Sequence, residues 1–94
     1  MDLIFEWDEE KARENLRKHK VSFEEGKTIF NDPLSITFPD KTHSRDEERY
    51  ISVGSSSAGR VLIVSHTNRK PAIRIISCRK ATASERRRYE EDEG

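Results

Sequence analysis

The chain has 94 residues, enough for one domain, of which 38% are charged and 32% hydrophobic. Its single cysteine, Cys78, excludes an internal disulfide and fits a reducing cytoplasm. No run approaches the roughly 20 apolar residues of a membrane span. The apolar residues are clustered in short runs, which favours one folded domain over residues 1–94 with no membrane contact.

The charge is unevenly distributed along a chain whose net charge is zero. Residues 60–88 hold nine basic side chains against one acidic residue, Glu85. Residues 1–59 are acidic overall, and residues 90–94 form an acidic tail that we expect to be frayed. A strongly basic block inside a neutral protein indicates a surface that attracts polyanions such as nucleic acids.

A short strand and a first helix are predicted at the N-terminus. Residues 3–7 favour a strand, and Asp8 follows in the position of a helix N-cap. Acidic residues come next, where the helix dipole favours them. The helix is predicted to end near His19, with Ala12 and Leu16 facing the core.

A second helix and four strands are expected next. Ser22 and Glu25 have the spacing of a capping box, which predicts a short helix to about Phe30. The apolar period then changes from helical to two. The strands are predicted over residues 34–38, 49–55, 60–66 and 72–79. The third of these is the richest in β-forming residues and is expected at the centre of the sheet.

A last helix closes the predicted fold. Thr82 and Glu85 form a second capping box before a helix that carries Arg86, Arg88 and Tyr89. The expected order is β-α-α-β-β-β-β-α. Because the loops between the later strands have hairpin lengths, we expect an antiparallel sheet with the helices on one face. The predicted fold class is α+β.

Several short segments, in order from Trp7 to Tyr89, carry a resemblance to a known family. They include Phe5-Glu6-Trp7-Asp8, Val21-Ser22-Phe23-Glu24-Glu25, Phe30-Asn31-Asp32-Pro33 and Arg74-Ile75-Ile76-Ser77-Cys78-Arg79-Lys80-Ala81-Thr82. Together they resemble the BrnT family, the toxins of a bacterial toxin–antitoxin pair. The chain departs from the family at Lys20, where a glycine that suits a left-handed helix end is usual.

The resemblance implies a RelE-like fold and a metal-independent endoribonuclease that cleaves RNA, mRNA in particular, and arrests translation. It also implies an antitoxin similar to BrnA, a ribbon-helix-helix-like protein that would link the toxin to DNA only indirectly. An alternative is a non-catalytic protein-binding module with a basic face, or a degenerate toxin, acting in a DNA-bound repressor complex.

Cleavage of RNA without a metal needs a base for the 2′-OH, cations around the phosphate and an acid for the leaving oxygen. Arg79, at the end of the last predicted strand, is the candidate for the phosphate, because a guanidinium matches phosphate oxygens. The base and acid are sought among Glu85, Tyr89 and His43. The alternative for both of the first two is a structural role, Glu85 in capping the last helix and Tyr89 in packing that helix on the sheet.

Four further basic residues are candidates for binding the RNA backbone: Arg49, Arg74, Lys80 and Arg86. Arg74 and Arg79 are five residues apart, so an unbroken strand would direct them to opposite faces. Arg86 precedes Tyr89 by three residues, so the two can face one site. The three histidines lack the spacing of a metal site, and we expect neither a metal nor another cofactor.

Overall fold

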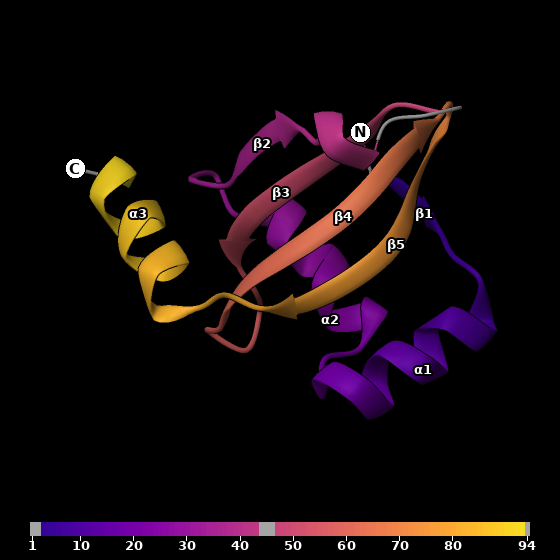
Figure 1. The fold of residues 1–94 in the computed structure, drawn as a ribbon, viewed down its shortest axis with the longest axis horizontal. Coiled ribbons are helices and arrows are strands. Elements are labelled where there is room, and N and C mark those ends of the chain that lie inside the picture. The colour runs from indigo at the N-terminus through magenta and orange to yellow at the C-terminus, as the bar shows by residue number, and fades with distance from the viewer. Residues whose placement is uncertain (1–2, 44–46, 94) are drawn as a thin grey trace.

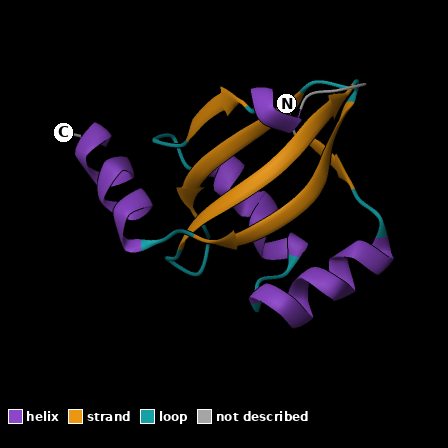
Figure 2. Cartoon of the chain, in the orientation of Figure 1, coloured by secondary structure: helices purple, strands orange, loops and turns teal. Residues whose placement is uncertain are grey.

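A five-stranded sheet with helices on both sides forms the fold in the computed structural model, which describes residues 3–43 and 47–93 (Figures 1 and 2). The strands are β1 (Ile4–Glu6), β2 (Ile36–Pro39), β3 (Arg49–Ser55), β4 (Val61–Arg69) and β5 (Ala72–Lys80). The helices are α1 (Glu9–His19), α2 (Phe23–Gly26) and α3 (Ala83–Glu93), with short 3₁₀ helices η1 (Lys27–Asn31) and η2 (Lys41–His43). No helix in these ranges is long and apolar enough to cross a membrane.

The sheet is mixed, with the spatial order β1-β5-β4-β3-β2, and β4 is central as predicted. The strands β2, β3, β4 and β5 pair antiparallel with one another in that order. The first strand runs parallel to β5, with Glu6 opposite Arg74, so the prediction of a purely antiparallel sheet was wrong for β1. No hairpin joins β1 to its neighbour, and the helices that follow it carry the chain away before β2 begins.

The helices cover both faces of the sheet, which corrects the expectation that they share one face. Successive residues of a strand point to opposite faces. Leu62 and Val64 of β4 pack in the main core with α2, whereas Ile63 packs with Val53 and with Tyr89 of α3. We call the side that carries Val53, Ile63 and Tyr89 the α3 face. In Figure 1, α2 lies behind the strands and α3 lies at the left.

Helix α1 begins and ends as the sequence predicts. Asp8 caps it by accepting hydrogen bonds from two backbone N–H groups of the first turn. Lys20 ends it in the left-handed conformation, with φ of 61°, and donates its N–H to the carbonyl of Leu16. The inward position predicted for Leu16 is wrong, because this side chain is half exposed and Asn15 is buried instead.

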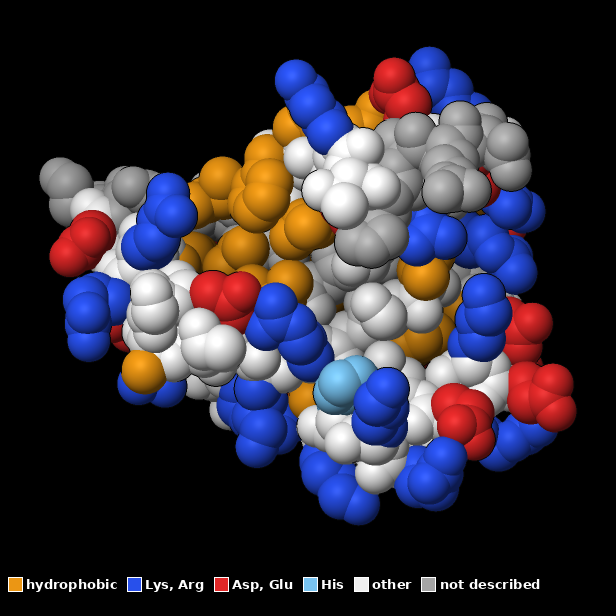
Figure 3. Space-filling model, viewed as in Figure 1, with side chains coloured by type: hydrophobic (Ala, Val, Ile, Leu, Met, Phe, Trp, Pro, Cys, Tyr) orange, Lys and Arg blue, Asp and Glu red, His pale blue; other side chains and the backbone are white. Residues whose placement is uncertain are grey.

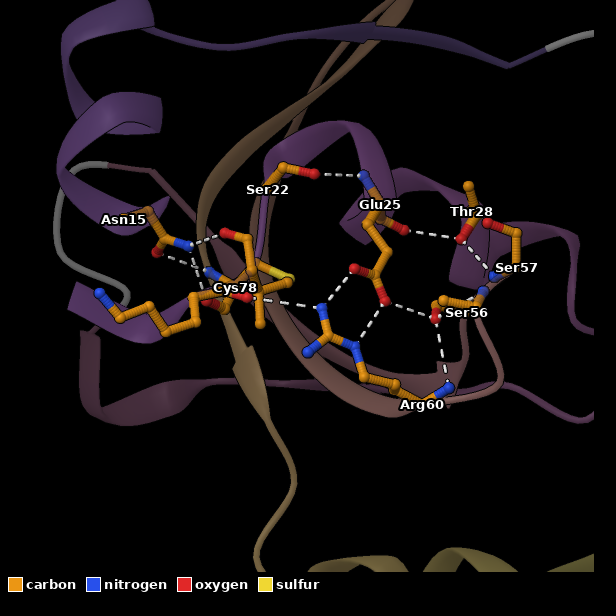
Figure 4. Close-up of polar contacts among 11 residues, drawn as sticks. Asn15, Ser22, Glu25, Thr28, Ser56, Ser57, Arg60 and Cys78 are labelled. Carbon is orange, nitrogen blue, oxygen red and sulfur yellow. Dashed lines mark hydrogen bonds and ion pairs between the residues drawn. The ribbon is translucent and has the colours of Figure 1, made fainter. Parts of the chain in front are cut away.

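Asn15 supplies the hydrogen bonds that β5 lacks where β1 has ended. Its side-chain amide donates to the carbonyl oxygens of Val21 at 2.9 Å and of Cys78 at 2.8 Å, and its Oδ1 accepts the Cys78 N–H at 3.1 Å (Figure 4). Since β1 pairs with β5 only as far as Arg74, this edge of β5 needs another partner. The Asn15 amide therefore joins α1 to β5.

An ion pair joins α2 to the β3–β4 hairpin. Arg60 donates through Nε to Glu25 at 3.0 Å and through Nη2 to the other carboxylate oxygen, and the Ser56 hydroxyl donates to the same carboxylate at 2.7 Å (Figure 4). Ser22 caps α2 by accepting the Glu25 N–H, as predicted. The Glu25 carboxylate, which a full capping box would direct back to Ser22, instead binds Arg60.

Helix α3 runs to Glu93, so the residues of the acidic stretch that the structure describes, 90–93, are helical. It begins with the predicted capping box, because Thr82 Oγ1 accepts the Glu85 N–H at 3.1 Å and the Glu85 carboxylate accepts the Thr82 N–H at 2.9 Å.

We predict that Asn15→Ala lowers the free energy of unfolding by on the order of 3 kcal/mol, because three buried backbone groups lose their partner. The neighbouring substitution Leu16→Ala, at a half-exposed site, should cost less than about 1 kcal/mol. Urea unfolding of both variants measures the difference. Equal losses would contradict the role given to Asn15.

Candidate active site

A groove with a volume of about 480 Å³ lies between α3 and the sheet. Five apolar side chains from β2, β3 and β4 form its floor, and four residues from the end of β5 and from α3 form its wall. The lining residues are Ile36, Phe38, Ile51, Val53, Ile63, Arg79, Glu85, Arg88 and Tyr89. Figure 3 shows the hydrophobic side chains gathered beside α3, with basic side chains around them.

A β-bulge in β5 places Arg74 and Arg79 on the same face. Arg74 lies opposite Thr67 of β4, and Arg79 lies opposite Ile63, four residues away on the same strand. Residues separated by an even number on a strand share a face. The register shifts next to Ile76, which adds one residue to β5 between the two arginines. The sequence spacing gives opposite faces only for an unbroken strand, and the bulge removes that condition.

Arg79 is bound by Glu85 through two parallel hydrogen bonds. Its Nη1 donates to Oε1 at 2.8 Å, and its Nη2 donates to Oε2 at 2.9 Å. These bonds, with a smaller contribution from Thr82, outweigh burial and lower the pKa of Glu85 to about 2. A carboxylate in this state is a weak base. The pair also fixes the start of α3 against the end of β5.

Tyr89 and Asp32 form a second attachment of α3 to the rest of the fold. The Tyr89 side chain is buried, and its hydroxyl donates to Oδ2 of Asp32, which also accepts the Ser55 N–H at 2.8 Å. The Leu34 N–H donates to the other oxygen at 2.9 Å. Burial favours the neutral acid, but the three hydrogen bonds together lower the pKa of Asp32. Tyr89 and Asp32 lie 57 positions apart, so no local sequence pattern indicates this contact.

Arg88 lines the groove, whereas the predicted Arg86 does not. Glu85, Arg88 and Tyr89 are spaced by three and four residues, so they share one side of α3. Arg86 is exposed and Tyr89 is buried, and the two do not face one site. In the described part of the chain the Arg88 side chain makes no ion pair or hydrogen bond. The helical spacing from Glu85 is the signal that identifies Arg88 from sequence.

Arg49 and Arg74 lie on the α3 face but at its far end. Both are opposite Thr67, four residues from the Ile63 position on β4, a separation of roughly 13 Å. Arg74 also pairs with Glu6 at 2.9 Å. The structure therefore places these two predicted RNA-binding residues on the side of the sheet that bears the groove, away from its lining.

Lys80 lies on the other side of the sheet from Arg79. It is exposed and opposite Leu62, whose side chain is buried in the main core. The backbone of His43 ends η2, and its side chain is outside the described part of the structure. Of the predicted residues, the groove therefore brings together Arg79, Glu85 and Tyr89.

His66 is unsuited to acid–base chemistry on a substrate in the groove, because it is buried on the main-core side of the sheet, opposite Ile75 and against Phe30. Its Nε2 is hydrogen-bonded to the Ser52 hydroxyl at 2.8 Å, and burial lowers its pKa to about 4. Among the side chains that the structure describes, no three His, Cys, Asp or Glu residues converge as metal ligands do.

The fold and the groove define a small α+β protein whose open site combines an apolar floor with guanidinium groups, a combination suited to ligands that carry phosphates.

The chain belongs to the BrnT family, since the family model for the ribonuclease toxin BrnT of type II toxin–antitoxin systems matches residues 7–85. The resemblance found in the sequence is thereby confirmed. The 1.1 Å crystal structure of the Brucella abortus ribonuclease toxin BrnT is similar in fold, with a TM-score of 0.68 at 21% sequence identity. The similarity covers 86% of this chain and 99% of that chain. A search of curated proteins finds no match.

We predict that Glu85→Gln lowers the free energy of unfolding at pH 7 by on the order of 1 kcal/mol, because Arg79 loses its anionic partner. The pKa of Glu85 is about 2 in the fold, against an ordinary value of 4.5. The stabilisation of the fold by the Glu85 charge is therefore complete above pH 4.5 and is lost as the pH falls toward 2. Wild type and variant should converge over that range in urea unfolding curves.

The substitution Glu90→Gln, on the same helix and exposed, is the control and should change stability little. A difference between wild type and Glu85→Gln that stays constant down to pH 2.5 would contradict the account.

Proposed function

We propose that this chain is a metal-independent, RelE-like endoribonuclease toxin that cleaves RNA, mRNA in the course of translation, in the groove beside α3. The observation that carries the proposal is the position of Arg79 in that groove, where it forms a bidentate pair with the Glu85 carboxylate. A phosphate presents a similar pair of oxygens to a guanidinium, so Arg79 can exchange one anion for the other. Membership of the BrnT family supports ribonuclease activity as the use of this site.

Arg79 would stabilise the extra negative charge that develops on phosphorus, and Arg88 would bind a neighbouring phosphate from the groove wall. A single strand leaving the groove along the α3 face would reach Arg49 and Arg74 at its far end. Arg86 and Lys80, both exposed and outside the groove, would contribute only to long-range attraction of RNA.

Glu85 is our candidate for the general base. While Arg79 binds it, the pKa of this carboxylate is too low for efficient proton transfer. A substrate phosphate that takes over the guanidinium would remove the main cause of that low pKa, so Glu85 would become more basic when RNA is in place. Tyr89 and His43 are the candidates for the acid that protonates the leaving oxygen.

The proposed physiological setting is the cytoplasm, with a co-encoded antitoxin similar to BrnA as the neutralising partner. We expect that antitoxin to be ribbon-helix-helix-like and to provide the link to DNA. Family membership in a type II toxin–antitoxin system supports a protein antitoxin.

We predict that Arg79→Ala reduces the rate of RNA cleavage by the purified chain more than a hundredfold, a cost of about 3 kcal/mol in activation free energy. Arg87→Ala is the matched control, because Arg87 is exposed and does not line the groove. It should reduce the rate only a few-fold, and this effect should fade as salt is raised. Melting curves establish that both variants fold.

Equal losses from the two substitutions would show that the basic block acts as a diffuse polyanion-binding surface. Absence of cleavage by the wild-type chain would favour the non-catalytic binding module.

We further predict that cleavage by the purified chain persists in excess EDTA, since the proposed chemistry uses side chains alone. Gel analysis of a defined single-stranded RNA, with and without EDTA, measures this. Loss of cleavage that a divalent cation restores would refute the metal-independent mechanism.

A further inference from the structure

The floor of the groove is apolar, which phosphate binding does not explain. Ile36, Ile51, Val53 and Ile63 offer no hydrogen-bonding group, and Phe38, at the β2 edge, keeps 44% of its surface exposed. We propose that this floor is a subsite for one unstacked nucleobase of single-stranded RNA, with Phe38 as the residue that stacks on it. The proposal rests on the proposed function and names the form of RNA that the site accepts.

The groove is large enough to take a base. Its volume of about 480 Å³ lies within the range of pockets that hold small-molecule ligands. It is bounded by α3 on one side and by β2, the edge strand of the sheet, on the other. A base inside a duplex is paired and stacked and cannot enter such a space, whereas a base in a loop or single strand can be splayed out.

The position of Phe38 suits stacking. Ile36 and Phe38 alternate with Thr37 on β2, so both side chains point to the groove side of the sheet. Because no further strand pairs with β2 in the described part of the chain, the ring is reached from solvent at the sheet edge. An exposed aromatic ring beside an apolar floor binds bases through their π-faces, which all four share.

The charges around the floor favour RNA over an apolar segment of a protein. Two guanidinium groups, those of Arg79 and Arg88, lie on the wall that faces the floor. A nucleotide bound with its base on the floor carries phosphates on both sides, and these match two cations. Since the floor lacks donors and acceptors, we expect it to bind bases with little discrimination, with the larger purines favoured.

The test uses a fluorescent single-stranded 2′-O-methyl RNA, which cannot be cleaved through a 2′-OH, and measures its Kd by anisotropy. Phe38→Ala should weaken binding roughly tenfold or more. Leu34→Ala is the matched control, because Leu34 is an exposed apolar side chain of similar exposure, 48%, outside the groove. It should change Kd less than twofold. Phe38→Leu, which keeps the apolar volume, should fold and still bind several-fold more weakly.

A fully abasic oligonucleotide with the same backbone completes the experiment. Wild type should bind it more weakly than the normal strand, and Phe38→Ala should cause no further loss with it, because the ring then has no base to stack on. Equal binding of the abasic and normal strands, or equal Kd values for the Phe38 and Leu34 variants, would overturn the base subsite. Binding of an antitoxin lost in Phe38→Ala with RNA binding unchanged would overturn it in favour of a protein ligand.

Cleavage assays on the same variants separate this inference from the proposed function. If Phe38→Ala cleaves RNA at the wild-type rate while Arg79→Ala does not, the subsite is wrong and the ribonuclease assignment stands. If the wild-type chain neither binds nor cleaves RNA, both are wrong.

Discussion

The pair of hydrogen bonds between Arg79 and Glu85 joins the start of α3 to the end of β5, and both residues line the groove. Within the described side chains of this helix, Tyr89 alone is buried, and it packs with Val53 and Ile63. Polar contacts also attach the helix at two points, the Arg79–Glu85 pair at its start and the Tyr89–Asp32 hydrogen bond further along. Such contacts stabilise less than a buried apolar interface, and they can be exchanged for contacts with a ligand.

This arrangement links binding of RNA to the chemistry that we propose. Arg79 cannot bind a phosphate with both of its terminal nitrogens while both bind Glu85. In the proposed mechanism, binding of a substrate phosphate would therefore change the partner of Glu85 and its basicity in one step, and it would loosen the start of α3 at the same time. The bulge in β5 places Arg74 on the same face as Arg79, where Arg49 of β3 also lies, and in our proposal RNA that leaves the groove would reach both.

Features that depend on neighbouring residues could be predicted from the sequence. The caps at Asp8 and Thr82 and the bounds of β3 follow from short-range patterns, and the structure agrees with them. The basic block and the family resemblance pointed to Arg79, Glu85 and Tyr89, which do lie together.

Features that depend on contacts between distant parts of the chain could not be predicted from the sequence. The bulge at Ile76 has no glycine or other local signal, so the shared face of Arg74 and Arg79 could not be derived from their spacing. The contacts of Asn15 with Cys78 and of Asp32 with Tyr89 span 63 and 57 residues, beyond any local pattern. The direction of β1 is set by its pairing with β5, which no turn specifies.

The central claim is that RNA binds in the groove through Arg79. The most direct measurement is an NMR titration of the isotope-labelled chain with an uncleavable 2′-O-methyl single-stranded RNA, followed through backbone and Arg side-chain resonances. The account predicts the largest shift changes at Phe38, Val53, Arg79, Glu85 and Arg88, including a changed Arg79 Nε–Hε signal as the guanidinium passes from Glu85 to phosphate. Shifts confined to the far end around Arg49 and Arg74, with the Arg79 and Glu85 signals unmoved at saturation, would contradict it.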